Sequence, residues 1–309
     1  MGIHFGSLTQ WLECKIEKKK IMDILIETDI GRDPDDFFTL CYLISAGVDI
    51  RGITITPGDK DQVAVTRLIT SVAGLDIPIG VSDLNRNKRS SGGVHYSLLD
   101  KYGMPKESES DGLGKDIIKS VIDEFPDCEL LSIGPVSNVM AFLNESDHVF
   151  KKATMQGGIL PYYLSRPIKT LEKFEGKSHF QSFNLNGDVV AGLEYASTDQ
   201  ILERRFVGKN ICHTVLYDKN IHKTVVPKDE VSNLFYSGMS IYLSGHDSKK
   251  YHDPAAAVCL LHPEIGKWFR GNLVQDISKG WTTISNENGD FVLADIDYEA
   301  LWDYIANFK

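Results

Sequence analysis

The chain has 309 residues, 42% of them hydrophobic, which is enough for one large α/β domain or two smaller ones. Its formal net charge of −10 argues against a nucleic-acid partner and against an anionic membrane surface. No apolar run approaches the length of a membrane span.

Residues 1–21 are a polar N-terminal extension without the long apolar core of a signal peptide. We expect this extension to be disordered or foreign to the native chain, because Met22 directly precedes the first predicted strand. The folded domain then spans residues 22–309. The five cysteines are widely spaced and odd in number, which indicates free thiols in a reducing compartment. Together these features predict a cytoplasmic protein.

The first predicted strand is the apolar run Ile24 to Ile26, which is typical of a strand buried on both faces of a parallel sheet. Gly31 and Pro34 then interrupt regular structure, and a helical pattern follows. Open α/β sheets bind their ligands where strands end and helices begin. Four acidic residues lie at this point: Asp29, Asp33, Asp35 and Asp36.

These four like charges lie within eight residues and repel one another in a partly buried crevice. Capping of the following helix accounts for one or two of them. A calcium ion takes about six to eight oxygen ligands and prefers carboxylates. The cluster therefore predicts a divalent-metal site, with helix capping alone as the alternative.

The rest of the chain alternates strand-like runs with helical patterns, which predicts parallel strands joined by right-handed crossovers. Residues 82–93 are expected to form an exposed loop, and residues 160–181 a lid, a binding loop or a disordered segment. The fold class is a single-domain α/β fold with an open, mostly parallel, Rossmann-like sheet flanked by helices. The predicted strands are 52–56, 77–81, 128–133, 153–155, 211–217 and 291–296, and the predicted helices are 62–73, 115–125, 228–243, 255–261 and 298–305.

Five motifs follow one another along the chain: the acidic cluster 27–36, Ser132-Ile133-Gly134-Pro135-Val136-Ser137-Asn138, Gln156-Gly157-Gly158, Ser182-Phe183-Asn184 followed by Asp188, and His252-Asp253-Pro254. With these motifs in this order, the chain resembles the calcium-dependent inosine-uridine nucleoside hydrolases over nearly its whole length after residue 22. The acidic cluster and the His-Asp-Pro segment are specific in combination, whereas the other three motifs are weak alone.

The chain also departs from the pattern of this family. Glu27 replaces the first aspartate of the cluster, and two extra residues precede Asp35 and Asp36. Ser182 stands where the family usually has a sugar-holding glutamate, and Asp59 where it usually has an asparagine. The serine and the long loop favour another N-ribosyl or sugar substrate as an alternative to a nucleoside. The alternative from another class is a catalytically silent ribose-binding homologue.

The resemblance implies that a metal-activated water cleaves the N-glycosidic bond of a ribonucleoside, with Ca²⁺ as the cofactor. Asp29, Asp36, Asp253 and the backbone carbonyl of Ile133 would hold the ion. Asp29 would also be the general base. His252 would protonate the leaving base, with a helix-start residue as its alternative role.

The resemblance also implies the residues that bind substrate, namely Asp35, Asp59, His95, Ser182 and Asn184. Two of them have plain alternatives, because His95 could be an exposed loop histidine and Asn184 could simply cap a helix. The expected partner is a small-molecule nucleoside or N-riboside. The family further implies a homodimer or homotetramer.

Overall fold

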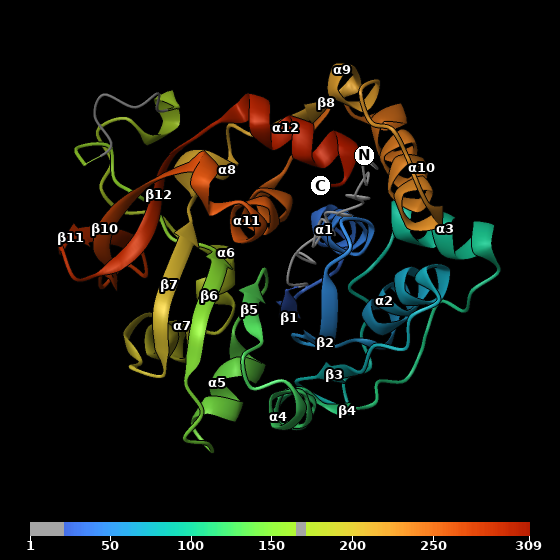
Figure 1. Ribbon diagram of the computed structural model, residues 1–309, viewed down its shortest axis with the longest axis horizontal. Helices are drawn as coiled ribbons and strands as arrows, with labels where there is room; N and C mark the ends of the chain where they lie inside the picture. The colour runs from blue at the N-terminus through green and yellow to red at the C-terminus, as the bar shows by residue number, and fades with distance from the viewer. Residues whose placement is uncertain (1–21, 165–170) are drawn as a thin grey trace, which may run out of the picture.

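The computed structural model describes residues 22–164 and 171–309, so the predicted N-terminal extension lies outside the described residues. A ten-stranded sheet with the order β11-β10-β12-β7-β6-β5-β1-β2-β3-β4 forms its centre, and β8 pairs with β9 separately (Figure 1). The strands are β1 (Asp23–Thr28), β2 (Asp49–Ile55), β3 (Ile79–Val81), β4 (Gly112–Leu113), β5 (Glu129–Ser132), β6 (Phe150–Gln156), β7 (Ile201–Val207), β8 (Leu216–Asp218), β9 (Ser248–Lys250), β10 (Gly266–Gln275), β11 (Trp281–Ser285) and β12 (Asp290–Ile296).

The sheet is parallel from β4 through to β12. Only β10 runs antiparallel, to β12 on one side and to β11 on the other. The prediction of an open, mostly parallel sheet in a single α/β domain is confirmed.

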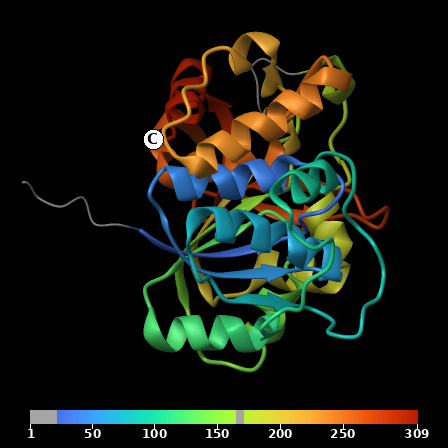
Figure 2. The same ribbon diagram turned by 90° about the vertical axis from the view of Figure 1, so that its right-hand side faces the viewer.

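Helices cover both faces of the sheet (Figure 2). One core joins α1, α2, α10, α11 and α12 on one face, and a second core places α4, α5 and α7 on the other. The helices are α1 (Asp35–Ser45), α2 (Lys60–Ala73), α3 (Val94–Tyr102), α4 (Gly114–Glu124), α5 (Ser137–Leu143), α6 (Phe183–Gly187), α7 (Val189–Ser197), α8 (Lys209–Cys212), α9 (Lys219–His222), α10 (Glu230–Gly245), α11 (His252–Leu261) and α12 (Tyr298–Asn307), with short 3₁₀ turns η1 (Glu172–Phe174) and η2 (Pro263–Ile265).

The strand order reverses around β1, which lies between β2 and β5. The chain connections on the two sides of β1 run in opposite directions across the sheet. A crevice therefore opens at the carboxyl ends of the central strands. The backbone N–H of Ile133 donates to the carbonyl of Glu27 at 2.7 Å, which aligns the end of β5 with the end of β1. Asp29 and Ile133 therefore reach the same edge of the sheet.

Several element predictions need correction. The predicted strand 211–217 is wrong, because its first two residues belong to α8 and only its last two belong to a strand, β8. The Asn210 side chain explains α8, since it bonds to the Leu160 N–H and the Leu293 carbonyl at 3.0 Å each, far away in the chain. The strands β7, β10 and β11 and the helix α3 were not predicted. Residues 82–89 of the predicted loop are mostly exposed, whereas Ser91 is buried.

The four described cysteines are free and buried, as predicted, and Cys14 lies outside the described residues. None of the helices in the described ranges is long and apolar enough to cross a membrane.

Candidate active site

A pocket of about 300 Å³ opens at the reversal point of the sheet. It receives residues from the ends of β1, β5 and β6 and from the first turns of α1, α6 and α11. Eight of the ten residues predicted for the site line this pocket: Asp29, Asp35, Asp36, Ile133, Ser182, Asn184, His252 and Asp253.

The local sequence explains how the aspartates enter the pocket. Asp35 and Asp36 form the first turn of α1, and Asp253 lies in the first turn of α11, where helix N-termini favour negative charge. The two helices pack against each other, which brings their first turns together. Carboxylate oxygens of Asp35, Asp36 and Asp253 all lie within 4.8 Å of one another. The three side chains are almost fully buried.

Burial and mutual repulsion raise the pKa values of Asp29, Asp36 and Asp253. Burial followed by the neighbouring Asp35 raises the pKa of Asp29 to about 7. Burial also raises the pKa of Asp36 well above its usual value, and Asp29 adds to the effect. For Asp253, burial and then Asp35 do the same. Such a set of converging oxygen donors fits a hard divalent cation, which would stabilise the ionised carboxylates.

One ammonium group compensates part of this charge. Lys249, in β9, places its Nζ at 2.8 Å from Asp33 and 3.3 Å from Asp35. Burial alone would lower the pKa of Lys249, but Asp35 and Asp33 raise it above its usual value. Sequence reasoning missed this lysine, because more than two hundred residues separate it from the two aspartates.

Asn184 and Ser182 brace the pocket wall at the start of α6. The Asn184 amide donates to the Ile133 carbonyl at 2.9 Å and to the Gln156 carbonyl at 3.0 Å. The Ser182 hydroxyl accepts from the Gly158 N–H at 3.2 Å. Asn184 thus fixes the orientation of the Ile133 carbonyl at the pocket edge.

His252 opens α11 and places its Nδ1 at 3.8 Å from Asp35. Its Nε2 is buried without a partner among the described residues. The ring stacks on His213 with ring centroids 4.9 Å apart. Burial and the nearby Lys249 lower the pKa of His252 to about 4, so the ring is neutral at neutral pH.

A second set of potential metal ligands joins Cys212, His213 and His252. Burial raises the pKa of the Cys212 thiol to about 12, so the thiol keeps its proton at neutral pH. Lys173 and Lys209 lie close enough to lower the pKa of His213. These positive charges oppose a cation here, and we assign the metal to the acidic group.

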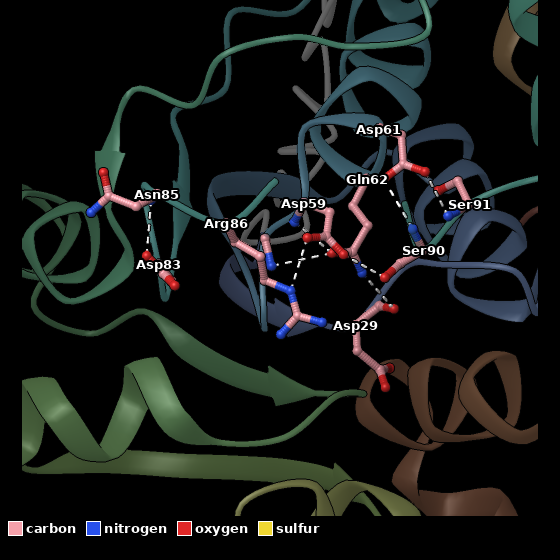
Figure 3. Close-up of polar contacts among 10 residues, drawn as sticks. Asp29, Asp59, Asp61, Gln62, Asp83, Asn85, Arg86, Ser90 and Ser91 are labelled. Atoms are coloured by element: carbon pink, nitrogen blue, oxygen red, sulfur yellow. Dashed lines mark hydrogen bonds and ion pairs between the residues drawn. The ribbon is translucent and has the colours of Figure 1, made fainter. Parts of the chain in front are cut away.

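The structure does not bring Asp59 and His95 into the pocket. Asp59 is fully buried and receives Arg86 Nε at 2.8 Å and the Ser90 hydroxyl at 2.5 Å. Figure 3 shows Asp59 turned toward these partners, while the Asp29 carboxylate points away from it. His95 is buried in α3 against Phe37, so it is not an exposed loop histidine.

Comparisons with known proteins agree with this fold. A family model for the inosine-uridine preferring nucleoside hydrolases matches residues 24–303. A search among curated proteins gives no match. A plant nucleoside hydrolase is 18% identical with a TM-score of 0.69, covering 92% of this chain and 98% of that one.

Two bacterial structures are similar in the same way. The inosine-uridine preferring nucleoside hydrolase from Bacillus anthracis is 15% identical with a TM-score of 0.67, covering 92% of this chain and 98% of that one. The purine-preferring ribonucleoside hydrolase from Gardnerella vaginalis is 14% identical with a TM-score of 0.65, covering 93% and 97%. At such identities, the shared feature is the fold.

Proposed function

Since the chain belongs to the inosine-uridine preferring nucleoside hydrolase family, we propose that it is a Ca²⁺-dependent hydrolase of the N-glycosidic bond of a ribonucleoside. Members of this family are N-ribosyl hydrolases, so family membership gives the reaction class. The observation that carries the proposal is the convergence of Asp29, Asp35, Asp36 and Asp253 in one pocket. Lys249 is the one ammonium group of the described residues that forms ion pairs within this cluster, so much of its negative charge stays uncompensated.

The residues that would hold Ca²⁺ are Asp29, Asp36, Asp253 and the carbonyl of Ile133. When bound, the ion would supply a polarised water and a grip on the ribose hydroxyls. Asn184 keeps the Ile133 carbonyl oriented through its 2.9 Å hydrogen bond. Lys249 holds Asp35 and Asp33, and therefore the loop before α1, in place.

Asp29 would accept the proton of the attacking water, because it directly follows β1 and lines the pocket. Asp35, Asn184 and Ser182 line the same pocket and would contact ribose hydroxyls. His252 lines the same pocket beside Asp35, its Nε2 has no partner among the described residues, and it would donate to the leaving base. In the reaction, the bond between C1′ and the base nitrogen breaks and a bond between C1′ and the water oxygen forms.

The deciding experiment measures base release from a panel of purine and pyrimidine ribonucleosides, with Ca²⁺ and with a chelator. We expect release only with the metal. Asp253→Ala should abolish it, whereas Asp123→Asn, on the exposed surface of α4, should not. Ribose binding without base release would instead support the silent homologue. A homo-oligomeric state and a role in nucleoside salvage stay predictions from the family resemblance, and a cytoplasmic location stays a prediction from the N-terminal segment and the cysteines.

A further inference from the structure

The pocket has a basic rim beside its acidic group, and we define the basic rim as Lys173, Lys209 and His213. Lys209 and His213 line the pocket directly. Lys173 reaches His213 with its Nζ at 2.6 Å from Nδ1. The Lys209 ammonium lies 4.6 Å from the centroid of the Phe183 ring, at the start of α6.

Lys173 and Lys209, the two charged members of the basic rim, disfavour positive charge on their neighbours. Burial, followed by His252, Lys173, Lys250 and Lys209, lowers the pKa of His213 to about 3, so this ring is neutral at neutral pH. Burial likewise lowers the pKa of Lys209, and Lys173 adds to the effect. Positive charges gathered in this way destabilise one another unless an anion joins them.

No protein carboxylate supplies that anion among the described residues. Carboxylates are absent from the groups that shift the pKa values of Lys173 and Lys209. The pocket residues beside Lys209 at the start of α6, which are Ser182, Phe183 and Asn184, are all uncharged. Lys249 differs from Lys173 and Lys209, because Asp33 and Asp35 at the edge of the same pocket neutralise its charge. The basic rim is therefore built like a receptor for an anionic ligand group.

We propose that the basic rim binds an anionic group of the substrate, which makes the substrate an anionic N-riboside. This inference rests on the proposed N-riboside hydrolysis. Two sources share the chemistry, namely a 5′-phosphate on the ribose and a carboxylate on the base. In both cases the C1′–N bond breaks, water oxygen bonds to C1′, one water proton passes to the base, and the anionic group is unchanged.

The test compares uridine, uridine 5′-monophosphate and orotidine, whose base carries a carboxylate, in the presence of Ca²⁺. We expect kcat/KM for one of the anionic substrates to exceed that for uridine by at least about tenfold, since hydrogen bonds to charged groups are the strong ones. Raising the salt concentration should shrink this preference. Preference for the monophosphate places the anion on the ribose, and preference for orotidine places it on the base.

The variant Lys209→Met keeps an apolar stem over Phe183 and removes the charge. It should reduce the preference for the anionic substrate by about tenfold or more, through a larger loss on that substrate than on uridine. Lys223→Met, in an exposed position that does not line the pocket, is the matched control and should keep the preference. Equal kcat/KM values for the three substrates, or an unaltered preference in Lys209→Met, would overturn the proposal.

A binding measurement separates failure of this inference from failure of the proposed hydrolysis. If none of the three compounds releases its base, the hydrolase proposal fails. Calorimetry with the same compounds then tests whether the basic rim binds an anionic group. Tighter binding of an anionic compound than of uridine, lost in Lys209→Met, would support the basic rim without any catalysis. Equal affinity for all three compounds would contradict an anion-binding role of the basic rim.

Discussion

Two groups of aspartates lie at the carboxyl ends of neighbouring parallel strands, one after β1 and one after β2. The second group is the pair Asp59 and Asp61, and both carboxylates accept hydrogen bonds from other residues of the protein. Asp59 receives Arg86 and Ser90, and Asp61 receives the N–H groups of Ser90 and Ser91. The first group consists of Asp29, Asp35 and Asp36, together with Asp253 from the first turn of α11, and it has few such donors. Burial raises the pKa values of Asp29, Asp36 and Asp253.

This difference separates structural carboxylates from functional ones. A buried carboxylate with matching donors holds a loop in place, as Asp59 and Asp61 hold the segment around Ser90 (Figure 3). A buried carboxylate that faces other carboxylates needs a cation or a proton. Asp29, Asp35 and Asp36 follow a strand, as Asp59 and Asp61 do, so a position after a strand does not by itself distinguish the two groups.

The largest expected effect comes from removing one charge of the first group at the reaction centre. Asp29→Asn keeps the shape and one oxygen but removes the proposed proton acceptor. General-base contributions are typically ~10²–10⁴-fold, so kcat should fall at least that far while KM changes much less. Asp61→Asn is the control from the second pair and should leave kcat within a few-fold. Near-normal turnover in Asp29→Asn with bound metal would shift the base role to Asp33 or Asp35.

Measuring both Ca²⁺ binding and stability in one variant from each group should distinguish the two groups. Asp253→Ala should abolish Ca²⁺ binding in calorimetry without lowering the stability of the metal-free protein, because it relieves repulsion. Asp59→Ala should keep Ca²⁺ binding but leave Arg86 and Ser90 without their acceptor. That loss should lower the free energy of unfolding by about 1–3 kcal/mol. If both variants lose stability and keep the metal, the distinction between the two groups fails.

The sequence predicts the first group well, because a buried strand, Gly31 and the His-Asp-Pro segment mark it locally. It also predicts the parallel core, since β1 and β5 contain short apolar stretches, Ile24-Leu25-Ile26 and Leu130-Leu131. The structural role of Asp59 cannot be predicted from its local sequence, because its partner Arg86 comes from a loop after β3. The pairing of Lys249 with Asp33 and the bracing of α8 by Asn210 also depend on contacts made only in the folded chain.

The two groups should also differ in how they respond to pH in chelator-treated protein. Asp29 has a folded pKa of about 7, above the usual value of 3.8. A raised folded pKa contributes stability that is full below the unfolded pKa and is lost as the pH rises through the folded pKa. The melting temperature of the metal-free protein should therefore fall by a few degrees between about pH 4 and pH 8. Saturating Ca²⁺ should remove most of this fall, and a flat profile without metal would contradict the raised pKa.

The smallest expected effect concerns His252, which borders the first group without belonging to it. Its ring is neutral at neutral pH, so it would offer the leaving base one N–H hydrogen bond. A hydrogen bond of this kind contributes about 1 kcal/mol, which corresponds to about fivefold in rate. His252→Ala should therefore slow natural nucleosides about fivefold more than p-nitrophenyl riboside, whose leaving group needs little protonation. His246→Ala, on the exposed turn after α10, is the control. Equal losses on both substrates would leave His252 a structural role, stacked on His213 beside Asp35.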